Sequence, residues 1–170
     1  MIKLHPVLVK AVVEALQIIF AENRHADKVI EQTLKSNPKW GARDRAFIAE
    51  SVYDMVRHYR LLYELDGAPP ASPADWYRLF GTYRLLNDLE LPPWVEFEGV
   101  KKSRIADKYP ALRQVRAIRE SVPDWLDALG AAELGNQWEA TLQALNQPAQ
   151  VVLRTNVLKT NRETLIKQLL

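Results

Sequence analysis

Apolar residues that recur every three or four positions dominate the first hundred residues, and this spacing constrains the fold most strongly. It places apolar side chains on one side of an α-helix, where they can pack into a core. One stripe consists of Leu4, Leu8, Ala11, Val12, Ala15, Leu16 and Ile19. A second, shorter stripe consists of Ala26, Val29, Ile30, Thr33 and Leu34. The pattern predicts a mainly α-helical protein.

Two further helices are predicted before residue 90. The first should cover residues 42–64, after a break in the pattern at Gly41. Its buried side would consist of Phe47, Ile48, Val52, Met55, Val56, Tyr59, Leu62 and Tyr63. The second should follow Ser72, which can cap it, because Pro73 suits the first helical position and Asp75 lies three residues after the cap. Its apolar side would consist of Trp76, Leu79, Phe80, Tyr83 and Leu86.

Beyond residue 90 the periodic pattern weakens, so shorter helices are expected. Two pieces fall around residues 103–108 and 110–119, and a further helix should start at Ser121-Val122-Pro123-Asp124. Gly130 and Gly135 are expected to separate that helix from the next one. Three tryptophans lie on apolar helical stripes, so core packing explains them better than stacking on bases; they are Trp76, Trp125 and Trp138.

The spacing changes to alternation near the C-terminal end of the sequence. The alternating positions are Val151, Leu153 and Thr155 on one side and Val152, Arg154 and Asn156 on the other. This pattern predicts a β-strand. Thr160-Asn161-Arg162-Glu163 matches a capping box, and the helix that it predicts would have Leu165, Ile166, Leu169 and Leu170 on its apolar side. One strand and one helix cannot form a sheet alone, so we expect the start of a small α/β unit.

The sequence contains no cysteine, which excludes disulfides, thiolate metal sites and thiol nucleophiles. Lys10 and Glu14 interrupt the first apolar stretch, whereas a signal peptide or a membrane span requires an uninterrupted apolar run. We therefore expect a protein that is neither exported nor embedded in a membrane. A cytoplasmic location also fits the absence of cysteine.

The common patterns of catalytic and cofactor sites are missing. The six glycines are too scattered for a phosphate or dinucleotide loop, and no Gly-x-Ser-x-Gly elbow occurs. The three histidines, His5, His25 and His58, lie in different segments without the spacing of metal ligands. The chain alone is a poor candidate for an enzyme, and we expect it to bind neither a metal nor a cofactor.

Basic residues are concentrated in one short stretch, although the whole chain has a formal net charge of only +2. Residues 1–100 contain 12 Lys and Arg against 14 Asp and Glu. Residues 101–119, in contrast, contain seven basic residues and one acidic residue, Asp107. A local positive excess attracts phosphate groups and indicates RNA as a partner.

Three groups of polar residues are candidates for contact with RNA. The first group consists of Arg43, Arg45, Arg57, His58 and Arg60. The second group consists of Lys101, Lys102, Arg104, Lys108, Arg113, Arg116 and Arg119, and its last three arginines should share one side of a helix. The third group consists of Arg154, Asn156 and Lys159, at the end of the expected strand.

Each group also has an interpretation that does not involve RNA. The first could form a solvated helix surface paired with Asp54 and Glu64. The second could be a solvated surface or could pair with acidic residues of the N-terminal half. The third resembles any outward strand face. Both interpretations stay open at this point for each group.

The sequence resembles two kinds of known protein. Arg43-Asp44-Arg45-Ala46-Phe47-Ile48, followed by Val52-Tyr53 and Arg57, resembles a recurrent signature of NusB-like helical domains. Later segments resemble the Sun (Fmu) family of S-adenosylmethionine-dependent RNA 5-cytosine methyltransferases. These segments are Glu120-Ser121-Val122-Pro123-Asp124-Trp125-Leu126, Ala144-Leu145-Asn146 and Val152-Leu153-Arg154-Thr155-Asn156-Val157-Leu158-Lys159-Thr160. The resemblance covers most of the chain, and the order and distance of its Ser-x-Pro-x-Trp and Leu-Arg-x-Asn-x-Leu-Lys-Thr stretches are fairly specific.

The resemblance implies a NusB-like helical domain over residues 1–120, connecting helices over 121–147 and the truncated start of an RNA-recognition-like α/β subdomain over 148–170. The implied function is to bind RNA, with ribosomal RNA as the favoured substrate, and to position it for a catalytic domain absent from this chain. That domain would bind S-adenosylmethionine and supply the catalytic cysteines. The break inside an α/β unit favours a fragment of a longer enzyme.

The alternative is a NusB-like module that binds a protein partner in transcription or ribosome assembly. It would be favoured if the cations of residues 101–119 were paired with acidic residues inside the chain. A small independent enzyme, a third possibility, would need a convergent polar cleft for which the sequence offers no constellation.

Overall fold

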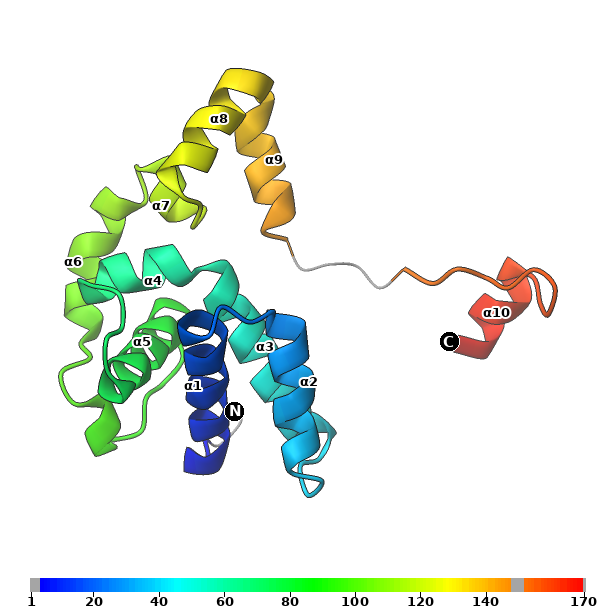
Figure 1. The fold of residues 1–170 in the computed structure, drawn as a ribbon, viewed down its shortest axis with the longest axis horizontal. Coiled ribbons are helices and arrows are strands. Elements are labelled where there is room, and N and C mark those ends of the chain that lie inside the picture. The colour runs from blue at the N-terminus through cyan, green and yellow to red at the C-terminus, as the bar shows by residue number, and fades with distance from the viewer. Residues whose placement is uncertain (1–3, 148–151, 170) are drawn as a thin grey trace.

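The structure is a computed structural model that describes residues 4–147 and 152–169. The described residues are mainly α-helical, as the periodicity of the sequence predicts (Figure 1). The first elements are α1 (Pro6–Ala21), α2 (Ala26–Ser36), α3 (Ala42–Arg57), α4 (Tyr59–Asp66), α5 (Pro73–Leu86) and the short 3₁₀ helix η1 (Val95–Phe97). They are followed by α6 (Lys102–Leu112), α7 (Arg116–Arg119), α8 (Asp124–Leu134), α9 (Gln137–Leu145) and α10 (Arg162–Leu169).

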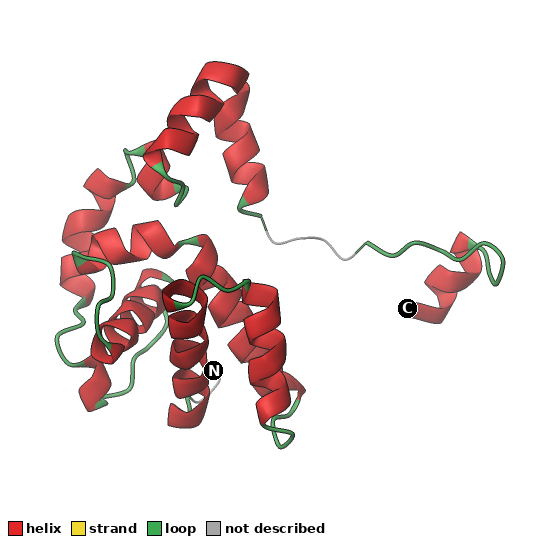
Figure 2. Ribbon diagram, viewed as in Figure 1, coloured by secondary structure: helices red, strands yellow, loops and turns green. Residues whose placement is uncertain are grey.

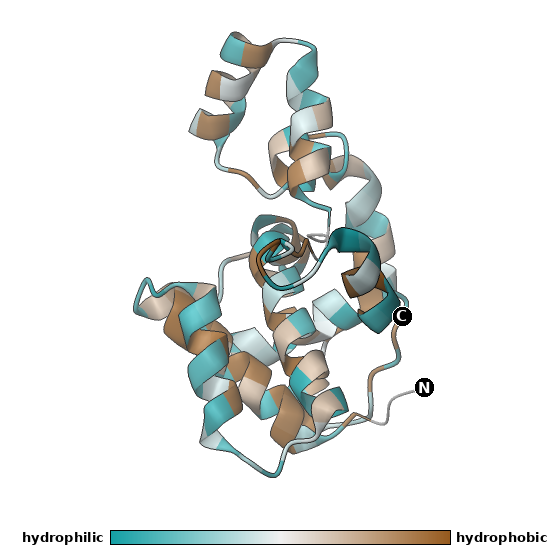
Figure 3. Cartoon of the chain, turned by 90° about the vertical axis from the view of Figure 1, so that its right-hand side faces the viewer, coloured by the Kyte–Doolittle hydropathy of each residue, from teal (hydrophilic) through white to brown (hydrophobic). Residues whose placement is uncertain are grey.

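Helix α1 forms the centre of the main hydrophobic core, because it contacts α2, α3 and α5. Val9 and Val12 of α1 pack there with Ile48 of α3 and Phe80 of α5, and all four are fully buried. The stripe that the sequence predicts within α1 is buried, and so are Val9 and Val13, which lie outside it. A helix that packs against three neighbours buries more than one side. Figure 3 shows hydrophobic and hydrophilic residues on different sides of the helices.

The prediction of one helix over residues 42–64 is wrong, because the chain breaks at His58 into α3 and α4. Neither proline nor glycine marks this break. The backbone of His58 leaves helical geometry, with φ −107° and ψ 21°. The turn lets Leu62 join the main core while Leu61 and Leu65 pack with Ile105 of α6 in a second cluster. Packing of α4 between two clusters therefore accompanies the break.

The cap predicted for the next helix is confirmed. The hydroxyl of Ser72 accepts a hydrogen bond from the backbone N–H of Asp75 at 3.4 Å. The Asp75 carboxylate accepts in return from the N–H groups of Ser72 and Ala71, at 2.8 and 3.0 Å. These reciprocal bonds satisfy N–H groups at the start of α5, and Pro73 occupies the first turn.

The basic stretch is divided between two helices. Helix α6 continues through Pro110 to Leu112, and α7 starts only at Arg116. Arg113 therefore lies between the helices. The expectation that Arg113, Arg116 and Arg119 share one side of a helix is wrong, because α7 is a single turn that contains only the last two.

Helices α8 and α9 form an antiparallel pair (Figure 1). Gly130 was expected to separate two helices but lies inside α8. Gly135 and Asn136 separate α8 from α9. A Cβ atom at Gly130 would lie only 2.3 Å from the indole of Trp138. Glycine thus allows the indole to approach the α8 backbone, while the indole N–H donates to Asp127 at 2.8 Å.

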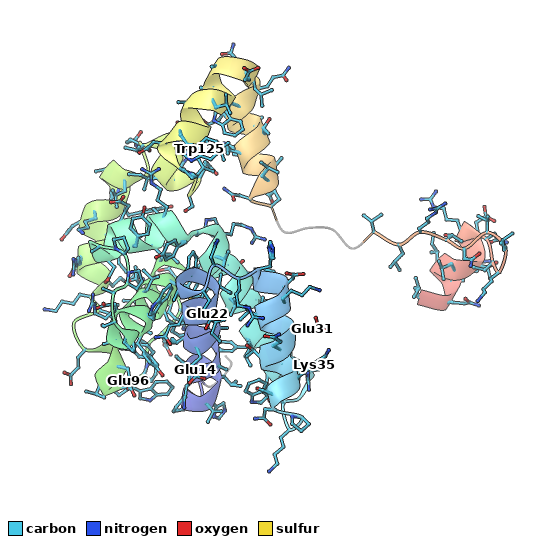
Figure 4. The ribbon with its side chains drawn as sticks, in the orientation of Figure 1. Glu14, Glu22, Glu31, Lys35, Glu96 and Trp125 are labelled. Carbon is cyan, nitrogen blue, oxygen red and sulfur yellow. The ribbon has the colours of Figure 1, made fainter. Side chains whose placement is uncertain are left out.

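The core prediction holds for two of the three tryptophans. Trp76 and Trp138 are buried, whereas Trp125 is 67% exposed. The prediction for Trp125 is wrong because Trp125, at the start of α8 (Figure 4), stays exposed although α8 contacts α7 and α9.

The described part of the C-terminal segment contains α10 and no strand (Figure 2). Residues 152–156 form neither helix nor strand, since no described strand lies beside them to complete a ladder. Val151 and Leu170 lie outside the described residues. The predicted helix forms, but its cap is Asn161 rather than Thr160, because the Asn161 side chain accepts from the N–H of Thr164 at 2.8 Å.

Candidate nucleic-acid interface

In the first basic group, Arg45 supports the fold rather than an open surface. Its guanidinium donates to the carbonyl oxygens of Trp40 and Leu34, at 3.0 and 3.1 Å, and so joins the end of α2 to the start of α3. Arg43, two residues earlier, is exposed and has no side-chain partner among the described residues. Of these two arginines, Arg43 is the one that solvent or a ligand can reach.

The other arginines of this group, Arg57 and Arg60, also have partners. Arg57 pairs with Asp54 of its own helix at 2.9 Å. Arg60 donates to the carbonyl of Val122 at 2.6 Å and pairs with Asp124 at 2.8 Å. The side chain of Arg60 is only 17% exposed, so its role is to join α4 to the start of α8.

The first part of the second basic group holds the end of α4. Arg104 donates to the carbonyl of Asp66 at 2.5 Å, and Lys108 to that of Leu65 at 3.2 Å. Cations are stabilising at the C-terminal end of a helix, where carbonyl groups have no partner within the helix. Lys102 pairs with Asp88 at 2.5 Å on an exposed surface.

The second part of this group forms an ion-pair network with α8 and α9. The Arg116 guanidinium donates to both carboxylate oxygens of Asp127, at 2.7 and 3.1 Å. Arg119 donates to Glu120 at 2.9 Å and also to Glu139. The hydrogen bond from Arg116 lowers the pKa of Asp127, with a smaller contribution from the Trp138 indole. A bidentate contact of this kind fixes geometry as well as charge.

The acidic partners of Arg116 and Arg119 come from the segment that directly follows the basic stretch. Residues 120–147 contain five Asp and Glu and no Lys or Arg. Within the described chain, Lys101 and Arg113 are the members of the second group that are exposed without a side-chain partner. Acidic side chains thus compensate part of the basic excess inside the molecule. Pairing with the acidic N-terminal half, which the sequence analysis considered, occurs for Lys102, whereas Arg116 and Arg119 pair with residues 120–139. The acidic composition of residues 120–147 is the sequence signal that could have indicated this.

The third basic group lies in a segment whose cations are open. Residues 152–169 form the C-terminal basic segment, with Glu163 as its one acidic residue. Its exposed cations, which have no side-chain partner in the described chain, are Arg154, Lys159, Arg162 and Lys167. Asn156 organises a turn, because its side-chain oxygen accepts from the N–H of Leu158 at 3.1 Å. Of the three groups, this one leaves the largest number of cations available to phosphate.

Among the residues that the structure describes, His, Asp and Glu side chains do not cluster in threes that could hold a metal ion. Within the same residues, no helix has both the length and the apolar character needed to cross a bilayer.

Comparison with known proteins gives one match, to residues 122–170. This part of the chain matches the family model described as Methyltr_RsmF/B-like, ferredoxin-like domain. Neither the curated proteins nor the solved structures include a match to the chain. The match supports the resemblance to Sun-type methyltransferases for these residues and includes the whole C-terminal basic segment. The division of the chain at residues 120 and 147 stays a prediction.

Proposed function

We propose that this chain binds RNA and positions it for an RNA cytosine-5 methyltransferase, with ribosomal RNA as the substrate and the cytoplasm as the location. One observation carries the proposal: the part of the chain that matches an RsmF/B-like methyltransferase domain also contains the group of cations without internal partners. In this proposal residues 1–120 form a NusB-like domain that supports the binding segment.

The RNA contacts would come mainly from Arg154, Lys159 and Lys167, which can each approach a phosphate without breaking an ion pair inside the described chain. The amide N–H₂ of Asn156 is a further donor, since only its oxygen is used in the turn. Arg43, Lys101 and Arg113 are exposed and could add contacts. Arg45, Arg60, Arg116 and Arg119 would have to give up internal hydrogen bonds first.

The methyl transfer itself requires groups that this chain does not have. A thiolate must attack the pyrimidine ring to activate carbon 5, and the sequence has no cysteine. Its scattered glycines do not form a loop for S-adenosylmethionine either. We therefore assign cofactor binding and catalysis to a separate domain and derive no chemical step for this chain.

The test is a titration of the chain against a structured ribosomal RNA fragment by fluorescence anisotropy at several salt concentrations. The log of affinity should fall linearly with the log of salt, because each phosphate contact releases counterions. Lys159→Ala combined with Lys167→Ala should reduce that slope by roughly 1.4 to 1.8, at about 0.7 to 0.9 per lost contact.

A control variant and one possible outcome decide whether Lys159 and Lys167 contact the RNA. Arg116→Ala is the matched control, because it removes a cation that is already paired with Asp127, and its slope should equal that of the wild type. If the Lys159 and Lys167 variant keeps the wild-type affinity at every salt concentration, the binding segment is wrongly assigned.

A second function is favoured by the pairing of the 101–119 cations. The helical part of the chain would then act as a NusB-like module that binds a protein in transcription or ribosome assembly. Three of the seven cations pair with acidic side chains, namely Lys102, Arg116 and Arg119. Two more, Arg104 and Lys108, donate to backbone carbonyl groups. Absence of RNA binding even at low salt would favour this function over the first.

A further inference from the structure

His58 is the single residue between α3 and α4, at a turn whose second helix contacts α7 (Figure 1). Its Nδ1 atom is buried and has no hydrogen-bond partner among the described residues. The side chain does not cap α4 either. Buried polar side-chain atoms are normally hydrogen-bonded, so the imidazole holds a polar atom at this turn that the packing leaves unsatisfied.

The first turn of α4, which follows His58 directly, holds the later part of the chain. Arg60 makes the two contacts to residues 122 and 124 described above. The backbone N–H of Leu61 donates to the Ser121 hydroxyl at 3.1 Å, so Ser121 does for α4 what an N-cap side chain does within a helix. Ser121 has φ +58°, a left-handed conformation that is uncommon for serine. All these contacts begin within three residues of His58.

The charged groups that face His58 already have other partners. Asp54 and Arg57 face it from α3, and Glu120 from the end of α7. The Asp54 carboxylate accepts from Arg57 at 2.9 Å. The Glu120 carboxylate accepts from Arg119, also at 2.9 Å. A protonated imidazole would therefore meet no free carboxylate here, while the guanidinium of Arg57 repels it.

Burial decides how this turn responds to a proton. A cation at His58 would be favourable at the C-terminal end of α3 and unfavourable at the start of α4, so the two helix ends oppose each other. Burial lowers the pKa of His58, and the smaller effect of Asp54 opposes it. The stabilisation by neutral His58 is therefore complete above the usual histidine pKa of about 6.5 and is lost as the pH falls below it.

We propose that His58 acts as a proton-operated latch, which holds α7, α8 and α9 on α4 when it is neutral and loosens them when it is protonated. The imidazolium has two N–H donors that need acceptors, and water can supply them only if the turn opens. Opening the turn displaces Arg60 and Leu61, and so breaks their contacts with residues 121–124. The latch would act whether or not the chain binds RNA.

Hydrogen exchange of the whole chain tests the latch. It would be read by mass spectrometry from about pH 7.5 down to about pH 5, with each rate divided by the intrinsic rate at that pH. Protection of α7, α8 and α9 should fall with pH by at most about tenfold per pH unit, because opening takes up one proton. Helices α1 and α2 should stay protected.

Two variants show whether His58 is the group that responds. His58→Gln, which cannot take up a proton, should keep α7, α8 and α9 protected at every pH in the window. His25→Gln is the matched control, because it removes an exposed histidine before α2, and it should respond as the wild type does. A wild-type response in His58→Gln would overturn the latch. Equal loss of protection in all helices would also overturn it, since the molecule would then unfold as one unit.

Nuclear magnetic resonance of the wild type gives a measurement that does not require the His58 variant to fold. The chain has three histidines, so His5→Gln and His25→Gln, both at exposed positions, assign the third imidazole resonance to His58. That resonance should titrate with a midpoint below about 6.5, in the pH range where α7, α8 and α9 lose protection. A midpoint above this value would overturn the latch, because the closed turn would then favour the protonated form.

Discussion

Gly130 is the residue at which the packing of α9 on α8 leaves least room. We expect Gly130→Ala to destabilise the protein, although alanine favours helices by about 1 kcal/mol over glycine. The new Cβ atom would meet the Trp138 indole at 2.3 Å, and overpacking of this kind costs typically about 1 to 3 kcal/mol. Urea denaturation of the variant and the wild type measures the difference.

Gly41→Ala provides the comparison for this change. An added Cβ atom at Gly41 meets nothing closer than the Asp44 carboxylate at 3.9 Å, so no overpacking arises there. Its effect on the free energy of unfolding should be limited to the weaker preference of alanine for the N-cap position of α3. A Gly130 variant as stable as the wild type would show that α9 can move away from α8 without cost.

Replacing Arg116 should lower the stability of the protein, whereas replacing Arg113, three residues earlier, should leave it almost unchanged. Arg116→Ala removes two hydrogen bonds to Asp127 and should lower the urea midpoint. Arg113→Ala, at an exposed residue, should change the free energy of unfolding by less than about 0.5 kcal/mol. A double-mutant cycle with Asp127→Asn measures the coupling of the pair. If the Arg116 and Asp127 changes prove additive, the ion pair contributes nothing to stability.

At the scale of elements, the start of α5 depends on its capping box. Ser72→Ala should destabilise the protein by about 1 kcal/mol, within a range of about 0.5 to 2 kcal/mol for lost caps. Thermal unfolding at neutral pH measures this effect. Ser72→Thr, which keeps a hydroxyl that can accept from the Asp75 N–H, should retain most of the wild-type stability.

The same cap makes the stability dependent on pH. The backbone N–H groups of Ala71 and Ser72 and the Ser72 hydroxyl lower the pKa of Asp75 from 3.8 to about 2. Because the folded pKa lies below the unfolded one, this stabilisation is complete above about pH 4 and is lost as the pH falls towards about 2. In Asp75→Asn, stability should change less with pH in that window, measured by urea denaturation.

Asp27→Asn, in the first turn of α2 but outside any capping box, is the matched control for the loss of an acidic side chain at a helix start. If Asp75→Asn follows the wild-type curve down to pH 2, the cap carboxylate does not stabilise the fold in its charged form.

Elements with a local cause could be predicted from the sequence, and elements with a distant cause could not. The start of α5 could be predicted from Ser72, Pro73 and Asp75, because all of its capping partners lie within four residues of one another. The break at His58 accompanies the packing of α4 on Ile105 of α6, which is distant in sequence, and no pattern near His58 predicts it. The cap of α10 was misplaced by one residue because Thr160 and Asn161 both suit that role.

The candidate RNA-binding residues, too, could be predicted only as far as local sequence determines them. The basic residues were identified from their number and spacing, but whether each is free to contact a phosphate depends on where the fold places the acidic residues. Arg104 and Lys108 hold carbonyl groups 38 and 43 residues away in sequence, which composition cannot indicate. The third group was the least conspicuous of the three in the sequence, yet it lies in the segment with the open cations.

At the scale of the whole molecule, Arg60 joins the N-terminal helices to the α7–α9 part. We expect Arg60→Ala to loosen α7, α8 and α9 while α1 to α3 stay protected, because Arg60 holds Val122 and Asp124. Hydrogen exchange read by mass spectrometry measures protection segment by segment. Arg57→Ala is the matched control, because Arg57 pairs within its own helix. Uniform loss of protection across all helices would mean that the molecule unfolds as one unit.

The sequence separations in these contacts also suggest an order of assembly. Arg116 and Asp127 are 11 residues apart, and Arg119 and Glu139 are 20 apart, whereas Arg60 and Val122 are 62 apart. Contacts between near neighbours in sequence form fastest, since less chain entropy is lost on closing the loop. During synthesis, Arg60 leaves the ribosome long before Val122 does. The surface of α4 around Arg60 therefore stays open to solvent, and to chaperones, until the acidic segment has been made.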